Sequence, residues 1–300
     1  MSGALLFPPE EIPEDPTAVR PNRAGIRHPL WTQNKALLIQ EYIRLFTFIT
    51  KHGVYIDGFA APQQRDKFGM CSANLVLANE PQWVRTFYLC DLDANGVVKL
   101  QEIADAHQAP KRKIEVIAGD FNKTVDDILA SGAIGEKTAT FALLDQRTFE
   151  CEWETVRKLA QHKKGMKIEL FYFFASGWID RSLAAATKPE KIGEIERWWG
   201  RDDWRDLRDV QGLDRARLLT RRFTEELGYA EAVPFAIHSR GRNGRIMYYM
   251  IHATDHPDAI PLMLRSYRKV SGRADVDREM TQIDLLDHLN EMAEADMSAQ

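Results

Sequence analysis

The sequence predicts an α/β fold in which a doubly wound, mostly parallel sheet is covered by helices on both faces. Five short apolar segments of strand length alternate with segments of helical periodicity over residues 31–184. Parallel strands need long crossover connections and are buried on both faces, so this alternation is typical of them. Two further strand-like segments near the C-terminus flank an Asn243-Gly244 turn signal, which predicts a closing antiparallel hairpin.

The elements follow in a regular order. Apolar residues recur at helical spacing between Leu37 and Ile49, which predicts an amphipathic helix over 31–51 that ends at His52-Gly53. The parallel strands are expected at 54–57, 86–93, 113–120, 140–145 and 167–174, with helices at 72–78, 94–106, 123–131 and 153–161. A helical insert over 188–230 precedes the hairpin strands at 232–239 and 245–254. We therefore expect a flexible N-terminal arm (1–24), one α/β domain (25–273) and an acidic C-terminal helix or tail (274–300).

Charge is unevenly distributed along the chain. The net charge is −4, yet residues 238–273 contain seven Lys or Arg against two acids, and residues 274–296 contain eight acids against one Arg. Such a local basic surface could neutralise phosphates. We expect phosphate contacts from Arg240, Arg242, Arg245, Arg268 and Lys269, and DNA as the partner. The alternative is a solvated hairpin with charged tips.

Membrane and metal sites have no sequence signal. No apolar run approaches the roughly 18 residues of a membrane span. The three cysteines, Cys71, Cys90 and Cys151, are far apart and show no metal-ligand spacing. We expect a reduced, cytoplasmic protein without a metal and without membrane contact.

Carboxylates end four successive strands. They are Asp57, Asp91 with Asp93, Asp120, and Asp145. Ligands of doubly wound sheets bind outside the carboxyl ends of the strands, so four acids at one edge predict a pocket there. The order of strands and the closing hairpin are those of the Rossmann-like class I methyltransferase fold.

Six short motifs follow one another in a characteristic order: YIDGFAAPQ at 55–63, YLCDLDA at 88–94, Gly119-Asp120-Phe121-Asn122, LLDQRT at 143–148, FASGWIDR at 174–181 and MYYMIHATDH at 247–256. In these motifs, between about Trp31 and Lys269, the chain resembles the three-Cys-motif partner (TcmP) family, a methyltransferase-like group. The resemblance implies a separate three-Cys-motif protein as a partner. In the methyltransferase-like template, Asp57 with Gly58 would cradle the methionine end of S-adenosylmethionine, Asp91 would hold its ribose hydroxyls, and Asp120 would face the adenine.

Two departures from the family pattern concern the cofactor loop. Ala61 and Gln63 replace glycines, and the fourth strand ends in Asp-Gln-Arg instead of Asp-Pro. Alanine at positive φ costs on the order of 1 kcal/mol, and a Gln side chain would occupy ligand space. We therefore expect a rebuilt pocket that needs no cofactor. The alternative is that the backbone relaxes and S-adenosylmethionine still binds.

A cofactor-free pocket would still contain acids, amides, cations and aromatic rings. We expect Asp57 and Asp145 to be catalytic, because a carboxylate beside a sugar can orient water or stabilise an oxocarbenium-like centre. The remaining residues would hold a flipped-out base through amide hydrogen bonds and stacking. They are Gly58, Phe59, Gln63, Gln64, Arg65, Asp91, Asp93, Asp120, Asn122, Gln146, Arg147 and Tyr172.

Three functions fit this set of residues. The first is cofactor-independent excision of a base from DNA, as by a DNA glycosylase in defence against phage or other foreign DNA. The second is an S-adenosylmethionine-dependent methyltransferase. The third is a catalytically inactive scaffold that binds nucleic acid or a partner. The run of four acids argues mildly against the third.

The basic hairpin gives a test of DNA binding. Changing Arg240, Arg242 and Arg245 together to alanine should weaken binding about equally for every DNA sequence, because phosphate contacts carry no base information. The slope of log affinity against log salt should flatten by about 2 to 3. Titrations of labelled duplexes at several salt concentrations measure both quantities. Unchanged affinity and slope would show that the hairpin is only a solvated turn.

Overall fold

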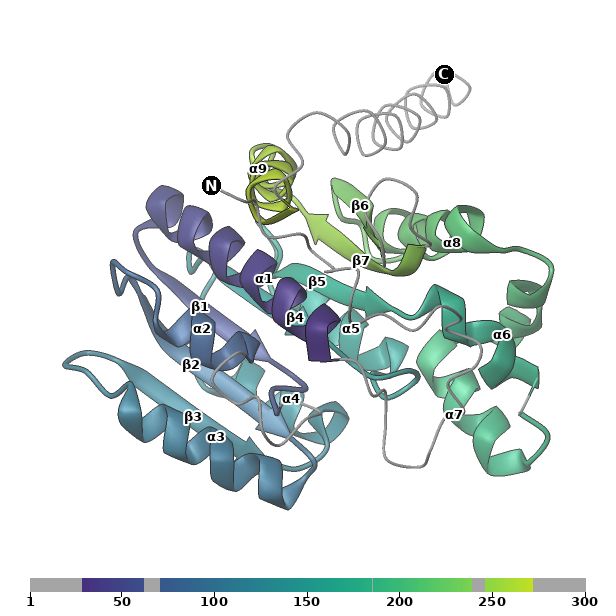
Figure 1. Ribbon diagram of the computed structural model, residues 1–300, viewed down its shortest axis with the longest axis horizontal. Coiled ribbons are helices and arrows are strands. Elements are labelled where there is room, and N and C mark those ends of the chain that lie inside the picture. Colours follow the sequence, from purple (N-terminus) through teal and green to yellow (C-terminus); the bar gives the residue numbers. More distant parts are fainter. Residues whose placement is uncertain (1–28, 62–70, 185, 239–245, 272–300) are drawn as a thin grey trace.

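The computed structural model describes residues 29–61, 71–184, 186–238 and 246–271. Within them, a seven-stranded sheet has the order β3-β2-β1-β4-β5-β7-β6. Strands β1 to β5 run parallel, and β7 pairs antiparallel with both β5 and β6 (Figure 1). This arrangement confirms the predicted fold class, including the closing antiparallel pair.

The strands are β1 (Gly53–Asp57), β2 (Val84–Asp91), β3 (Lys113–Ala118), β4 (Thr140–Leu144), β5 (Glu169–Phe174), β6 (Glu231–His238) and β7 (Ile246–Thr254). The helices are α1 (Pro29–Thr50), α2 (Ser72–Leu77), α3 (Ala94–Ala106), α4 (Phe121–Ala130), α5 (Trp153–Gln161), α6 (Ser176–Ala184), α7 (Pro189–Trp199), the 3₁₀ helix η3 (Asp202–Arg208), α8 (Gly212–Glu225) and α9 (Ala259–Ser271). The expected alternation of strands and helices is therefore present. Helix α9, which carries Arg268 and Lys269, is an element that the sequence analysis did not predict.

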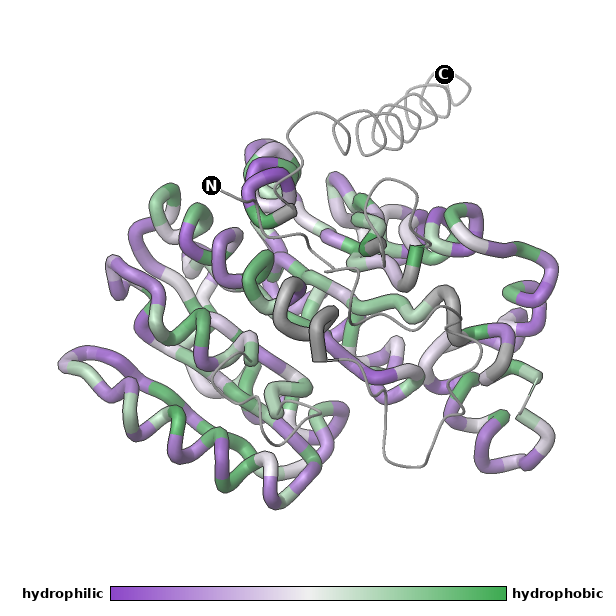
Figure 2. The backbone as a smooth tube through the Cα atoms, in the orientation of Figure 1, coloured by the Kyte–Doolittle hydropathy of each residue, from purple (hydrophilic) through white to green (hydrophobic). Residues whose placement is uncertain are grey.

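Successive strand residues supply the two hydrophobic layers of the domain. In β1, Tyr55 packs in one cluster, whereas Val54 and Ile56 belong to the other. The cluster that contains Tyr55 is covered by α1, α2, α3 and α9, and the opposite cluster by α4, α5 and the helices of 176–225. Figure 2 shows hydrophobic stretches concentrated in the strands and along one side of the helices. The alternation follows from the two-residue period of a strand that is buried on both faces.

Helix α1 is fixed to the sheet by buried polar contacts as well as by apolar packing. Tyr42 donates a hydrogen bond to the Glu169 carboxylate at the start of β5. His252 Nε2, on β7, lies 2.7 Å from the same carboxylate. All three side chains are nearly inaccessible to solvent, so the Tyr42 and His252 groups supply partners that the buried acid would otherwise lack.

The helical insert packs around one arginine. The Arg222 guanidinium lies 4.0 Å from the centroid of the Trp153 ring and 4.2 Å from that of Trp199. It also donates to the Trp199 carbonyl and to both carboxylate oxygens of Glu226. These contacts join α8 to α5 and to the end of α7.

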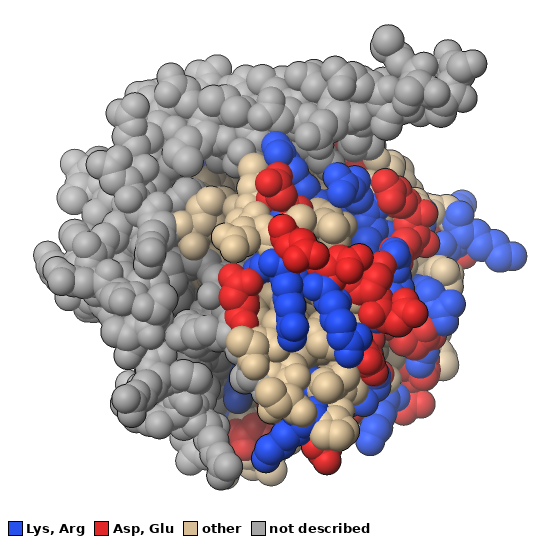
Figure 3. All heavy atoms as spheres, turned by 90° about the vertical axis from the view of Figure 1, so that its right-hand side faces the viewer, with Lys and Arg blue, Asp and Glu red and all other residues tan. Residues whose placement is uncertain are grey.

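The outer face of the insert carries both signs of charge, as Figure 3 shows. Ion pairs such as Lys191–Glu194 and Arg201–Glu226 interleave cations and acids there. This surface fits the balanced composition of residues 188–230 and does not form a basic strip. Among the described helices, none has the length and apolarity needed to cross a bilayer.

Arg222→Lys should lower the free energy of unfolding by about 2 kcal/mol, because lysine keeps the charge but loses the planar stacking and the forked hydrogen bonds. The matched control is Arg221→Lys, at an exposed position, where a change within about 0.5 kcal/mol is expected. Urea denaturation with an unchanged m-value measures both. Equal stability of the two variants would contradict the structural role of the Trp–Arg–Trp stack.

Candidate functional site

A pocket of about 550 Å³ lies at the carboxyl edge of the sheet. Strands β1 and β4 are neighbours at its centre, and the chain order of the strands reverses between them. Such a switch point is where doubly wound folds bind their ligands. The lining residues include Lys35, Asp57, Gly58, Phe59, Ala61, Asp91, Leu92, Asp93, Asp120, Phe121, Asn122, Asp145, Arg147 and Phe149.

Asp57 is the most deeply buried acid of the pocket. Its side chain is only 1% exposed, and it accepts hydrogen bonds from the Phe59 backbone N–H (3.3 Å) and the Tyr55 hydroxyl (3.2 Å). Burial, and then the negative charge of Asp145, raise the pKa of Asp57 to about 8. Asp57 therefore holds a proton at neutral pH.

Asp145 follows β4 and forms an ion pair with Lys35 of α1. The Lys35 Nζ to Asp145 Oδ1 distance is 2.5 Å, and the lysine side chain is 8% exposed. The ammonium also lies over the rings of Phe173 and Tyr248, at 4.7 and 5.4 Å from their centroids. The sequence analysis missed Lys35. Its signal was available, because Lys35 shares the buried stripe of α1 with Leu38, Ile39 and Tyr42.

Asp91 ties the first loop to the end of β2. Its Oδ2 accepts a hydrogen bond from the Ala61 N–H and its Oδ1 one from the Asp93 N–H, both at 2.8 Å. Asp93 in turn caps α3 by accepting from the Gly96 N–H at 3.0 Å. Leu92, between the two acids, is 76% exposed at the rim of the pocket.

The first loop corrects the expectation that Ala61 is strained and crowds the pocket. The non-glycine residues at positive φ within the described ranges are Lys51 and Lys111, so Ala61 needs no glycine-like backbone. A Cβ atom on Gly96 of α3 would lie 2.5 Å from the Ala61 methyl carbon. Gly96 therefore supplies the space that Ala61 occupies. Gln63, Gln64 and Arg65, also predicted for this loop, lie outside the described residues.

Gly58 packs against protein in this structure. A Cβ atom there would lie 2.7 Å from the Phe121 ring. The Phe121 ring, in turn, contacts Phe59 edge-on with a centroid separation of 5.9 Å. The glycine allows the loop to rest on Phe121, so both aromatic residues form one wall of the pocket.

Asp120 and Asn122 line the pocket, but their polar atoms mostly form hydrogen bonds within the protein. Asp120 caps α4, which begins at Phe121 and not at the predicted Lys123. The Asn122 amide donates to Asp120 Oδ1 and the Glu150 carbonyl, and its oxygen accepts from the Glu152 N–H and the Thr155 hydroxyl. With all four hydrogen-bonding positions occupied, Asn122 braces the loop after β4 and is not free to contact a ligand.

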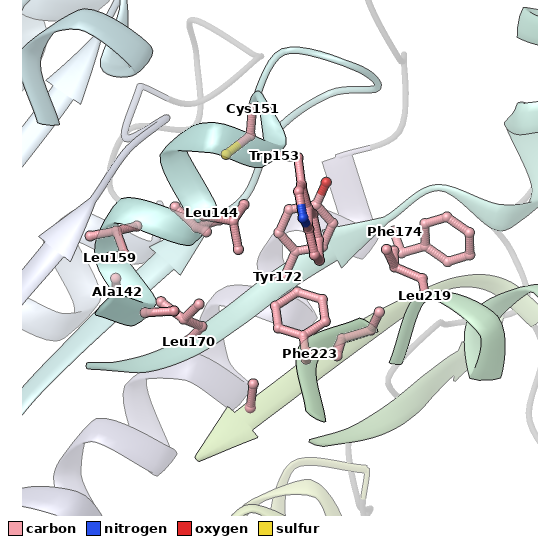
Figure 4. Packing of buried hydrophobic residues seen from close by; sticks show 14 of the residues in the cluster. Ala142, Leu144, Cys151, Trp153, Leu159, Leu170, Tyr172, Phe174, Leu219 and Phe223 are labelled. Carbon is pink, nitrogen blue, oxygen red and sulfur yellow. The ribbon is translucent and has the colours of Figure 1, made fainter. Parts of the chain in front are cut away.

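Gln146 and Tyr172 do not reach the pocket, which corrects their predicted roles. The buried Gln146 side chain donates to the Phe173 carbonyl (3.3 Å) and accepts from the Cys151 N–H (2.9 Å). Tyr172 is inaccessible to solvent and packs against Phe223 (Figure 4). Inward positions of β5 on this face belong to the core, so the Tyr172 ring cannot stack on a base.

The predicted phosphate-binding residues lie only in part within the described chain. Arg240, Arg242 and Arg245 lie outside the described residues. Arg268 and Lys269 belong to α9, where the Lys269 ammonium lies 2.7 Å from Glu41 of α1.

The pocket carries an excess of negative charge. Eight of its lining residues are acids and four are cations. Three of the cations are paired, Lys35 with Asp145, Arg197 with Glu152 and Lys191 with Glu194, whereas Arg147 has no ion pair within the described part of the chain. With Asp57 protonated, the surplus of acids still favours a cationic ligand over a phosphate-rich one.

Cysteine and metal chemistry have no support among the described residues. Cys71 lines the pocket as a free, buried thiol, and burial raises its pKa to about 11. A protonated thiol is a poor nucleophile. No group of three or more His, Cys, Asp or Glu side chains within the described ranges is arranged to hold a metal ion.

Comparison with known proteins adds structural likeness only. No protein-family model matches the chain, and no curated protein sequence matches it. The similar solved structures include a Legionella pneumophila protein of the DUF519 family, with 10% identity over 80% of this chain and 91% of that one, at a TM-score of 0.43. An O-methyltransferase from Bacillus cereus in complex with SAH has 10% identity over 79% of this chain and 94% of that one, at a TM-score of 0.42. TomG, an O-methyltransferase from Streptomyces achromogenes in complex with SAM, has 12% identity over 80% of this chain and 92% of that one, at a TM-score of 0.39.

The fold assignment rests on the strand order, which is that of a doubly wound, mostly parallel sheet with an antiparallel end. None of these comparisons links the chain to the TcmP family or to the excision of bases from DNA, so both stay predictions.

The buried Asp57 gives a pH test. Folded Asp57 keeps its proton up to about pH 8, whereas an exposed aspartate loses it near pH 3.8. Between these values the folded state binds more protons than the unfolded state, so its stability falls as pH rises. Asp57→Asn removes this penalty and should raise the melting temperature above wild type at pH 9, with a much smaller gain at pH 5.

The matched control for this pH test is Asp93→Asn, because asparagine caps a helix as well as aspartate does. This variant should follow the wild-type melting curve at both pH values. Parallel pH profiles of Asp57→Asn and wild type would show that Asp57 is ionised at neutral pH.

Proposed function

We propose that the protein is a methyltransferase whose cofactor, S-adenosylmethionine, binds in the pocket at the carboxyl ends of β1 to β4. The observation that supports this most directly is the rim formed by Asp91 and Leu92. A carboxylate and an exposed leucine stand side by side beside the loop of β1, in a pocket with surplus negative charge. This pattern suits a nucleoside that carries a positive charge.

The residues of the pocket fit this group. Asp91 uses one lone pair on each oxygen for the Ala61 and Asp93 amides, which leaves the others for ribose hydroxyls. Leu92 offers an apolar surface for the adenine, and the surplus acids favour the sulfonium. Ala61 lies against Gly96 and does not crowd the loop. The bound cofactor would supply an electrophilic methyl group.

The acceptor would lie on the side of Lys35 and Asp145. Asp145 is the candidate base, because its carboxylate is placed next to the pocket and is oriented by the Lys35 ammonium. Asp57 is protonated at neutral pH, so it would add no negative charge beside the acceptor. Three parts of this proposal rest on the sequence alone: DNA as the acceptor, a three-Cys-motif protein as the partner, and a cytoplasmic location.

Base excision from DNA is a second candidate, favoured by one observation. Asp57 is protonated near neutral pH, whereas Asp145 is paired with a lysine, and two carboxyl groups in different states are what glycosidic hydrolysis uses. The acid-rich lining would repel the phosphates of DNA in both candidates, but only the methyltransferase places a cation in it, the sulfonium of its cofactor.

Leu92→Ser tests the cofactor site. Wild-type protein should bind S-adenosylmethionine with a dissociation constant in the micromolar range, as measured by calorimetry. Leu92→Ser should weaken binding by about tenfold or more, because a leucine buried by a ligand contributes about 1.5–3 kcal/mol.

The matched control for the cofactor test is Val98→Ser, at a residue of α3 that is 59% exposed and lies outside the pocket lining. It should leave the affinity unchanged. Absence of binding by the wild type, or equal affinity of Leu92→Ser, would overturn the proposal. Mass analysis of DNA incubated with the protein, with and without S-adenosylmethionine, then separates the two activities: a gain of methyl mass supports the first candidate and release of free base the second.

A further inference from the structure

A second pocket, of about 390 Å³, lies at the opposite edge of the sheet. Its walls come from the end of α1, the starts of β4 and β5, the end of β7 and the start of α9. Phe46, Ile49, Met166, Ala259 and Leu262 give it a mostly apolar lining. Ile49 and Met166 are large hydrophobic residues that are 53% and 50% exposed at its mouth. Apolar surface of this kind in a concave site is typical of ligand pockets.

The acids that line this pocket are satisfied by protein donors. The Glu169 carboxylate accepts from Tyr42 and Thr254 and lies beside His252. Asp255 accepts from the backbone N–H groups of Ala230 and Lys167.

The remaining acid, Glu136, accepts from the N–H groups of Lys164 and Gly165, all at 3.1 Å. None of the three carboxylates therefore depends on a bound cation for a partner.

Lys163 is a buried lysine of this pocket, whereas Lys137, which also lines it, is exposed. Lys163 is only 5% exposed, and its ammonium donates one hydrogen bond within the described part of the chain, to the Thr138 carbonyl at 2.9 Å. An ammonium has three N–H donors, so two lack an acceptor among the described residues. Burial lowers the pKa of Lys163, and the charges of Glu136 and Asp255 act in the opposite direction, although neither acid forms an ion pair with it among the described residues. A buried cation with unused donors favours an anionic partner.

The neighbouring lysine does not share this property. Lys167 donates to the Gly228 carbonyl at 2.7 Å and lies 3.4 Å from Asp255, so its charge is already neutralised. The pocket thus combines one buried ammonium with apolar walls.

We propose that this second pocket binds an amphipathic monocarboxylate, with its carboxylate on Lys163 and its apolar body between Phe46, Met166 and Leu262. The volume suits a small molecule and not a folded partner. The pocket is at the far edge of the sheet from Asp57 and Asp145, and the proposal does not depend on the methyltransferase activity.

Octanoate and 1-octanol are suitable probes, because they share an apolar chain and differ in charge. Calorimetry on the full-length wild type should show saturable binding of octanoate, tighter than that of 1-octanol. Lys163→Met, which keeps the apolar stem, should weaken octanoate binding by about tenfold or more and leave 1-octanol binding unchanged, because it removes only the charge-assisted hydrogen bonds. Lys164→Met, at the adjacent exposed lysine, is the matched control and should bind octanoate as the wild type does.

Met166→Trp gives a second, independent test at an exposed position where the fold is not at risk. The larger side chain should close the mouth and weaken binding of both probes by about tenfold or more. S-adenosylmethionine titrations in the presence of octanoate should be unaffected if the two sites are separate. The proposal is overturned if octanoate does not saturate below about 10 mM, if Lys163→Met binds it as tightly as wild type, or if Met166→Trp leaves both affinities unchanged.

Discussion

Two polar side chains on the buried stripe of α1 must find partners in the sheet, and this requirement fixes where the helix lies. Lys35 meets Asp145 beyond the carboxyl end of β4, and Tyr42 meets Glu169 at the start of β5. A buried ammonium or hydroxyl without a partner would cost a few kcal/mol, so sliding the helix by one turn would break both contacts. The position of α1 in turn shapes both pockets, because Lys35 lines one and Tyr42 and Phe46 line the other.

The acids at the strand ends look alike in the sequence, yet the structure gives them different tasks. Asp57 is protonated and buried, Asp91 clamps two loops, Asp120 and Asp93 cap helices, and Asp145 is neutralised by a lysine from a distant element. An excess of carboxylates at one edge is tolerated because each is protonated, hydrogen-bonded to backbone N–H groups or ion-paired.

The strands, the helices between them and the closing hairpin could be predicted because apolar periodicity and turn residues are local signals, whereas the pairing of strands that are distant in the sequence was expected only from the resemblance to the methyltransferase fold. The pocket's position followed from the same signals, through the acids at the strand ends. The place of Lys35 on the buried stripe of α1 could have been predicted, but not its pairing with Asp145, because that partner is 110 residues away. The burial of Gln146 and Tyr172 depends on the helices packed over β5. The prediction that Ala61 is strained was also wrong. Its φ is not positive, and Gly96 of α3 leaves space for its methyl group.

Ala61 and Gly96 share one small volume between the first loop and the start of α3. A glycine at one position is needed when the other carries a methyl group, and two methyl groups would overlap. A loop without this glycine can therefore still form a functional pocket, provided that the facing residue on α3 is a glycine. During divergence, the two positions can exchange roles only through an intermediate with a small void or with overlapping methyl groups. Change at these two positions should be correlated among related chains, and a motif that counts loop glycines alone would fail to recognise those in which the exchange has occurred.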